Sequence, residues 1–154
     1  MSRKSANLSK SKAQSVKLAQ YLGFFMVGYI LASALLMLLQ TQIALNPQLV
    51  TLLSILVGAF IAVHKFIKHY SRALRKAEMV RLAIGGTGIV WLLNALYFFT
   101  IWLWLFDEAN RQVFIEMSLQ QPLPLLFALI AIVLLTFVSA GIGIWLFNRL
   151  LSPK

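Results

Sequence analysis

The sequence predicts an all-α membrane protein built as a four-transmembrane-helix bundle. Three observations lead to this fold class. The chain of 154 residues is 60% hydrophobic and only 12% charged, it contains four long apolar runs, and its basic residues gather beside those runs. A soluble domain carries about 25% charged residues, and a small one has too much surface for its volume to hide this much apolar area from water. Lipid as the solvent removes that difficulty.

The four predicted spans belong to one membrane domain, residues 18–151, and they are expected at about 18–39, 49–67, 82–106 and 123–147. Each run is close to the roughly 20 residues that cross about 30 Å of hydrocarbon, and none has an acidic or basic residue in its interior. The runs are apolar on all sides, whereas the strands of a membrane barrel alternate apolar and polar residues. Asn46-Pro47 predicts a short turn between the first two spans, and Pro122 and Pro124 stand where the fourth helix is expected to begin.

The charges predict an orientation. Five Lys and Arg lie in the N-terminal tail, residues 1–17, which we expect to be disordered or fraying; six lie between spans two and three, and two lie at the C-terminal end. The outer loop, 107–121, holds only Arg111 among three acids. The positive-inside rule therefore places both termini and the basic loop, 64–81, in the cytoplasm. The net charge of +10 is then a feature of topology rather than of nucleic-acid binding.

The basic loop is the first candidate for a functional surface. Its cations are candidate contacts for anionic lipid at the inner face or for a protein partner: Lys65, Lys68, Arg72, Arg75, Lys76 and Arg81. Apolar residues recur among them at steps of three and four, so span two is expected to continue as a cationic helix on the inner leaflet; these residues are Phe66, Tyr70, Ala73, Ala77 and Val80. The alternative is that the loop only sets topology. Glu78 is expected to form a weak surface ion pair with Arg75 or Arg81.

Asn94 and Thr87 are candidate polar contacts inside the membrane. Both fall on one side of the third span together with Trp91. An amide in hydrocarbon needs a partner, so the favoured role is to hold helices together, and the alternative is a polar point on a substrate path. Small residues are expected where helices approach closely: Gly28, Ala32, Gly85, Gly88, Ser139 and Gly143.

The sequence predicts no catalytic, cofactor-binding or metal-binding residues. The chain has no cysteine, which excludes thiolate chemistry. His64 and His69 are five residues apart, whereas metal-binding pairs on helices are usually three or four apart. Asp107, Glu108 and Glu116 have no histidine or nucleophile beside them, so we interpret them as a solvated face of a short interfacial helix in the outer loop.

Several residues of the second span and the basic loop carry a resemblance. They are Gly58-Ala59-Phe60, His64-Lys65-Phe66, Arg72-Ala73, Lys76, Glu78, Arg81-Leu82 and Trp91. This pattern, over about 45 residues, resembles a family of small four-span bacterial inner-membrane proteins with a basic cytoplasmic middle loop. That family has no established activity, so the resemblance implies a fold and no functional residue.

Two other four-span groups differ from this chain at their signature positions. Small multidrug transporters are similar in size but depend on a Glu in the first span, and this chain has none there. The polyprenyl-linked sugar flippase-like group is similar in length and basic inner loops. Its Asn-Arg signature after the second span is replaced here by His64-Lys65-Phe66.

These observations lead to three hypotheses. The first is a non-enzymatic accessory or envelope-maintenance protein that acts through helix–helix contacts, as a homo-oligomer or with a membrane-protein partner. The second is a small oligomeric transporter or lipid-carrier translocator with Asn94 and Thr87 on its path. The third is a toxin-immunity or phage-type membrane protein. An enzyme is disfavoured because membrane chemistry normally uses ionisable residues within the bilayer, and the spans lack them.

Overall fold

The computed structural model describes the backbone of residues 2–152 and the side chains of residues 18–152. The described chain consists of five helices and no strand: α1 (Ser2–Gln40), α2 (Pro47–Tyr70), α3 (Lys76–Trp104), α4 (Glu108–Gln120) and α5 (Pro122–Leu151). Four of them are long and apolar enough to cross a membrane, and the first does so over Leu18–Gln40. The predicted all-α, four-span fold class is therefore confirmed.

The helix ends differ from the predicted spans in instructive ways. Helix α3 begins at Lys76 and α5 ends at Leu151, so both run beyond the apolar segments that revealed them. The backbone of α1 begins at Ser2, within the predicted tail; the side chains of residues 1–17 lie outside the described part. With 29 and 30 residues, α3 and α5 measure about 45 Å, which is enough to cross the hydrocarbon core and both interfacial regions of a bilayer.

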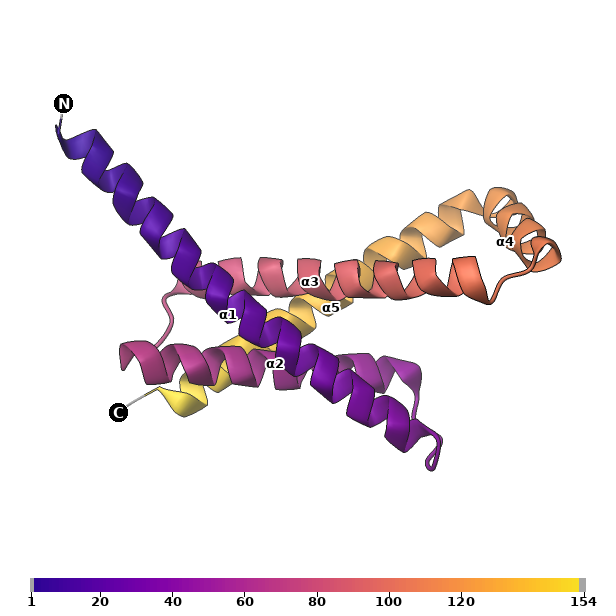
Figure 1. Cartoon of the computed structure of the whole chain (residues 1–154), viewed down its shortest axis with the longest axis horizontal. Coiled ribbons are helices and arrows are strands. Elements are labelled where there is room, and N and C mark those ends of the chain that lie inside the picture. Colours follow the sequence, from indigo (N-terminus) through magenta and orange to yellow (C-terminus); the bar gives the residue numbers. More distant parts are fainter. Residues whose placement is uncertain (1, 153–154) are drawn as a thin grey trace.

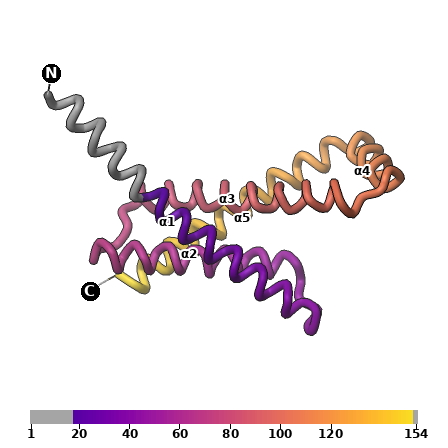
Figure 2. The backbone as a smooth tube through the Cα atoms, viewed as in Figure 1, coloured from indigo at the N-terminus to yellow at the C-terminus, as the bar shows by residue number. Residues whose placement is uncertain are grey.

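The long helices form two antiparallel hairpins that cross one another (Figure 1). Helix α1 packs on α2 and α3, and α5 packs on the same two helices, so the order around the bundle is α1, α2, α5, α3. One end of the molecule carries the turn between α2 and α3 and the last turn of α5 (Figure 2). We call it the basic end, because it holds six Lys and Arg from Lys65 to Arg81 together with Arg149. The opposite end, with α4 and the α1–α2 connection, is the α4 end.

The buried core lies toward the basic end. Phe25 and Ile55 are fully buried, as are Leu82 and Ile144, and together they bring one residue from each long helix into a single cluster. Buried residues of α3 stop at Val90, and those of α5 begin only at Thr136. The two hairpins are therefore packed together at the basic end and separate toward the α4 end (Figure 1).

Helices α1 and α2 approach each other closely at two glycines. A Cβ atom at Gly58 would lie 2.8 Å from the carbonyl oxygen of Phe25, and one at Gly28 would lie 3.1 Å from the Cα of Gly58. Gly28, Gly85 and Gly143 do lie where the sequence predicts close contacts, because an added Cβ would meet a neighbouring helix at each. Gly88 was predicted to make such a contact, but it faces open space, so that prediction is wrong.

The predicted continuous helix after the second span is also wrong. Helix α2 ends at Tyr70, and Ser71 takes a left-handed conformation with φ 50°. This residue terminates the helix, and α3 starts again after a turn of residues 71–75. Phe66 and Tyr70 therefore lie on a different helix from Ala77 and Val80, and the expected apolar face does not form. The expected helix of the outer loop does form, as α4, and the carboxylate of Asp107 caps it by accepting a hydrogen bond from the backbone of Asn110 at 2.9 Å.

Candidate functional site

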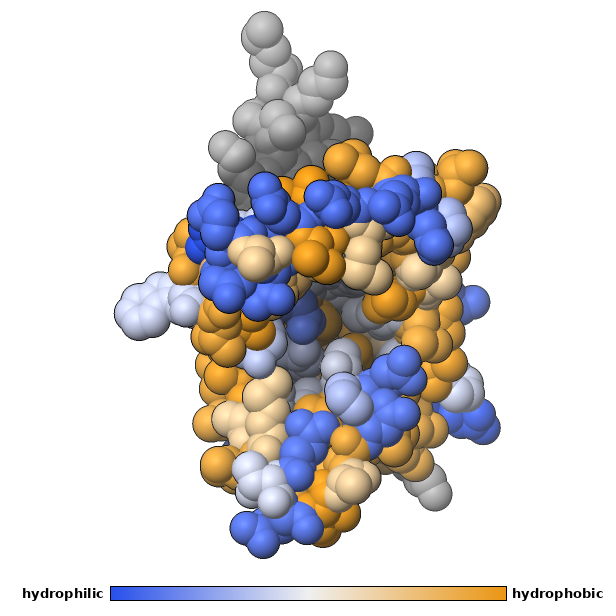
Figure 3. Space-filling model, turned by 90° about the vertical axis from the view of Figure 1, so that its right-hand side faces the viewer, coloured by the Kyte–Doolittle hydropathy of each residue, from blue (hydrophilic) through white to orange (hydrophobic). Residues whose placement is uncertain are grey.

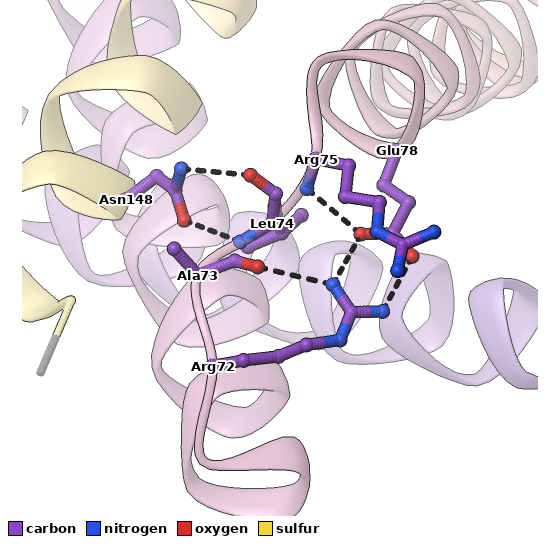
Figure 4. A network of polar contacts seen from close by, with 6 residues as sticks. All are labelled: Arg72, Ala73, Leu74, Arg75, Glu78 and Asn148. Atoms are coloured by element: carbon purple, nitrogen blue, oxygen red, sulfur yellow. Dashed lines mark hydrogen bonds and ion pairs between the residues drawn. The ribbon is translucent and has the colours of Figure 1, made fainter.

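The turn between α2 and α3 contains a polar network (Figure 4). The guanidinium of Arg72 donates to both carboxylate oxygens of Glu78, at 2.7 and 2.8 Å. It also donates to the carbonyl oxygen of Ala73 at 3.0 Å, and the backbone N–H of Arg75 donates to Glu78 at 2.8 Å. Glu78 thus caps the first turn of α3 and pairs with the residue that follows the left-handed Ser71. Paired hydrogen bonds of this kind fix the geometry of a turn as well as stabilising it.

This pairing corrects the predicted partner of Glu78. Arg75 and Arg81 lie within one helical turn of Glu78, but the ion pair forms with Arg72, six residues earlier. The reason is the break at Ser71, which folds the turn back over the start of α3. The guanidinium of Arg72 also lies 5.1 and 5.5 Å from the ring centroids of Phe66 and Tyr70.

The guanidinium of Arg72 makes its hydrogen bonds and ring contacts within the protein. The hydrogen bond to Glu78 raises the pKa of the Arg72 guanidinium above its ordinary value. Its donors and its faces are directed to Glu78, Ala73 and the two rings. Of the six cations predicted to contact lipid or a partner, Arg72 is therefore the one whose hydrogen bonds stabilise the turn.

A second contact, which the sequence analysis missed, joins the same turn to α5. The carboxamide of Asn148 accepts a hydrogen bond from the N–H of Leu74 at 2.8 Å and donates one to the carbonyl oxygen of Leu74 at 3.2 Å (Figure 4). It also donates to the sulfur of Met79 at 3.4 Å. Asn148 and Leu74 are both buried, and a buried backbone group left without a partner is costly. The signal for Asn148 in the sequence is a single amide in the last turn of an otherwise apolar helix.

The other cations of the basic end are exposed. Lys65, Lys68, Arg75, Lys76, Arg81 and Arg149 all present their side chains at the surface. Within residues 18–152 one ion pair forms, and it joins Arg72 to Glu78. Lys65 lies 5.6 Å from the ring of Phe24, and Arg149 lies 5.8 Å from the ring of Trp145. His64 stacks on Phe60 and His69 meets Tyr21 edge-on, so the two histidines face different neighbours.

Asn94 links α3 to α1 at the middle of the bundle. Its amide nitrogen donates to the hydroxyl of Tyr29 at 3.3 Å and to the carbonyl oxygen of Val90 at 2.8 Å. Thr87 is placed differently, because its hydroxyl is enclosed but has no hydrogen-bond partner within the described part of the chain. The indole nitrogen of Trp91, one turn further along, is likewise enclosed without a hydrogen-bond partner in the described part. The structure thus brings Asn94 and Tyr29 together and leaves Thr87 outside their contact.

Asn94 and Tyr29 also line a groove where the hairpins separate, which we call the α1–α3 groove. Its volume is about 530 Å³. Polar side chains project into largely apolar walls from α1, the start of α2, and α3: Tyr29, Ser33, Gln40, Thr51 and Asn94. Figure 3 looks onto the α4 end and shows it hollowed between two rims that carry hydrophilic residues. No charged residue lines the groove, so it suits an amphipathic or uncharged occupant.

The α4 end is organised by Arg111 and Phe114. Arg111 donates to the carbonyl oxygens of Trp102 and Leu103, at 3.1 and 3.3 Å, and so satisfies groups that the end of α3 leaves free. Phe114 contacts the rings of Phe98, Trp102 and Phe106. The acids Asp107, Glu108 and Glu116 are exposed, and the structure does not bring them together with either histidine.

No known protein family, curated protein or solved structure matches this chain. The resemblance to small four-span inner-membrane proteins therefore stays an expectation from the sequence.

Proposed function

We propose that the protein is an accessory component of a bacterial inner membrane that acts through helix–helix contacts, with a second copy or with another membrane protein. In this proposal it has no catalytic chemistry of its own and supports a membrane complex or the envelope. The basic end faces the cytoplasm, as the positive-inside rule expects.

The observation that carries the proposal is the placement of Asn94. Its side chain is exposed in the central part of α3, and its carboxamide oxygen accepts no recorded hydrogen bond from residues 18–152. In hydrocarbon a polar atom without a partner is unfavourable, and interhelical hydrogen bonds by amides stabilise association by about 1–2 kcal/mol in model peptides. A donor from another helix at this position would satisfy the oxygen.

The surroundings of Asn94 support the same proposal. From Trp91 to Trp104 no residue of α3 is buried, and none is buried from Pro122 to Leu135 of α5. Apart from the contacts of Phe98 and Trp102 with α4, these halves of α3 and α5 leave exposed surface that another helix can meet near Asn94.

Site-directed photo-cross-linking tests this proposal. A photoreactive residue in place of Tyr97 lies on the same exposed face of α3 as Asn94, one turn further along, and one in place of Val27 lies on an exposed face of α1 as the control. We expect the probe at position 97 to give a protein adduct, with a second copy or a partner, that Asn94→Leu removes, whereas the probe at position 27 gives lipid adducts. Lipid adducts at both positions, with a strictly monomeric protein in several mild detergents, would contradict the proposal.

The α1–α3 groove favours a second candidate, a translocator of amphipathic molecules such as lipid carriers. The groove opens between the hairpins and presents hydroxyl and amide groups from Tyr29, Ser33 and Asn94 within apolar walls. Such a path would let a polar head group pass while its chain stays in lipid.

A lipid-scrambling assay in liposomes tests the second candidate. We expect Asn94→Ala to reduce the rate several-fold, because it removes the amide from the groove. Thr100→Ala is the control, since Thr100 is exposed outside the groove and bonds only to the carbonyl of Leu96 in its own helix. Equal rates in both variants would exclude the proposed path.

A further inference from the structure

A second groove lies near the basic end, between α3 and α5, and we call it the α3–α5 groove. Its volume is about 360 Å³. Its walls come from one stripe on each helix: Lys76, Met79, Val80 and Ala83 on α3, and Phe137, Gly141 and Trp145 on α5. All of these except Lys76 are apolar or, in the case of Trp145, amphipathic. From Trp145 to Phe137 the groove follows α5 for about 12 Å.

The floor of the groove is hollow at Gly141. A Cβ atom built there would have no neighbour within 4 Å. Gly143, two residues further along, differs, because its Cβ would lie 3.0 Å from the side chain of Leu56. Gly141 therefore leaves space on the membrane-facing side of α5, while Gly143 serves packing inside the bundle.

Two cations lie at the end of this groove next to the α2–α3 turn, which we call its mouth: Lys76 lines the groove, and Arg149 lies beside the wall residue Trp145. Lys76 is exposed at the first position of α3, and Arg149 lies one turn beyond Trp145, with its guanidinium 5.8 Å from the Trp145 ring. Neither forms an ion pair with any residue from 18 to 152. Glu78 is the only acidic residue of the sequence outside the outer loop, 107–121, and Arg72 holds it. The mouth is therefore positive beside an apolar slot.

We propose that the α3–α5 groove binds one anionic phospholipid, with its phosphate between Lys76 and Arg149 and an acyl chain over Gly141. Positive residues next to an apolar path match the charge and the chain of such a lipid. Trp145 lies within the last two turns of α5, and indole rings favour the membrane interface. A second copy of this chain fits less well, because Glu78, the acid of its own basic end within residues 18–152, is held by Arg72 and does not meet the two cations. The groove is distant from Asn94, so the inference is independent of the proposed function.

Fluorescence quenching by brominated lipids tests the proposal on the full chain. Trp91, Trp102 and Trp104 are replaced by Phe, so that Trp145 is the only fluorophore of its kind. The protein is reconstituted in phosphatidylcholine with increasing fractions of brominated phosphatidylglycerol or of brominated phosphatidylcholine. We expect phosphatidylglycerol to quench Trp145 at a severalfold lower fraction than phosphatidylcholine.

Matched variants separate the groove from general surface charge. Lys76→Gln with Arg149→Gln is expected to bring quenching by the two lipids close to equal, because both cations that attract the anionic head group are lost. Lys65→Gln with Lys68→Gln removes the same charge from the same end and should leave the preference unchanged. Gly141→Leu fills the slot and should weaken quenching by both lipids, whereas Gly88→Leu, at an equally open position outside the groove, should not.

Three results would overturn the proposal. The first is equal quenching of Trp145 by the two lipids. The second is an equal loss of preference in the Lys76/Arg149 and the Lys65/Lys68 double variants, which would indicate only a general attraction of the lipid to the positive surface. The third is the absence of quenching by either lipid, which would mean that lipid does not reach Trp145 and that a protein covers the groove. The charge variants leave the packed core intact, so they test lipid binding in the α3–α5 groove even if Gly141→Leu fails to fold.

Discussion

At the scale of single residues, the basic turn is held by two polar side chains that reach across it. Asn148 brackets both backbone groups of Leu74, and Glu78 joins Arg72 to the first turn of α3. These contacts attach the turn to α5 on one side and to α3 on the other (Figure 4). The turn is therefore attached to both helices of the α3–α5 hairpin, and its exposed cations lie beside these attachment points.

Replacing Asn148 with Ala is expected to destabilise the protein by about 2 kcal/mol, because the buried N–H and C=O of Leu74 would both lose their partner. Chemical denaturation in detergent micelles measures the change. Asn110→Ala is the matched control, since Asn110 is exposed on α4. Similar unfolding curves for the two variants would show that Asn148 does not hold the turn.

Replacing Glu78 with Ala is expected to destabilise by about 1 kcal/mol, through loss of the ion pair with Arg72 and of the cap on Arg75. The effect should shrink at high salt, because the pair is only partly shielded from solvent, with 19% of the Glu78 side chain exposed. Glu116→Ala, at an exposed position of α4, provides the comparison. A loss of stability in Glu116→Ala as large as in Glu78→Ala would argue against a special role for Glu78.

At the scale of helices, the α1–α2 hairpin is the tightest unit. It depends on Gly28 and Gly58, which let the two backbones approach. Close backbone contact of this kind is a main source of helix association in lipid, where the hydrophobic effect does not drive helices together. The α3–α5 hairpin is looser, since its helices are buried only toward the basic end.

The substitution Gly58→Ala tests the role of this close approach. The new methyl would meet the carbonyl oxygen of Phe25 at 2.8 Å, and backbone cannot move aside as a flexible side chain can. We expect a loss of about 1–3 kcal/mol from overpacking. Gly23→Ala adds the same methyl to α1 in open space and should be neutral or slightly stabilising. A neutral Gly58→Ala would mean that the hairpin can relax at this point.

The sequence was sufficient for the spans, because 20-residue apolar runs have few alternatives to membrane helices. It was also sufficient for Asn94 as a polar residue within a span. It was not sufficient for the turn, because the left-handed Ser71 has no glycine signal and the partner of Glu78 depends on that break. The role of Asn148 depends on how α5 lies beside the turn, which no local pattern reveals.

At the scale of the whole molecule, the two hairpins join at the basic end and separate toward the α4 end (Figure 1). This arrangement places a positive, packed face at one end and an open, uncharged groove at the other. The asymmetry agrees with the charge bias from which the orientation is proposed, because thirteen Lys and Arg belong to one side of the spans and only Arg111 to the other.

Reporter fusions measure this orientation most directly. A reporter that is active only in the cytoplasm is fused after Lys154 or inserted beside Arg111, and a reporter active only outside the cytoplasm is placed at the same two positions. We expect cytoplasmic activity after Lys154 and external activity beside Arg111. The reverse pattern would contradict the proposed orientation. Activity of the same reporter at both positions would place Arg111 and Lys154 on the same side of the membrane. That result would contradict the single crossing by α5 between them, and with it the four-span fold.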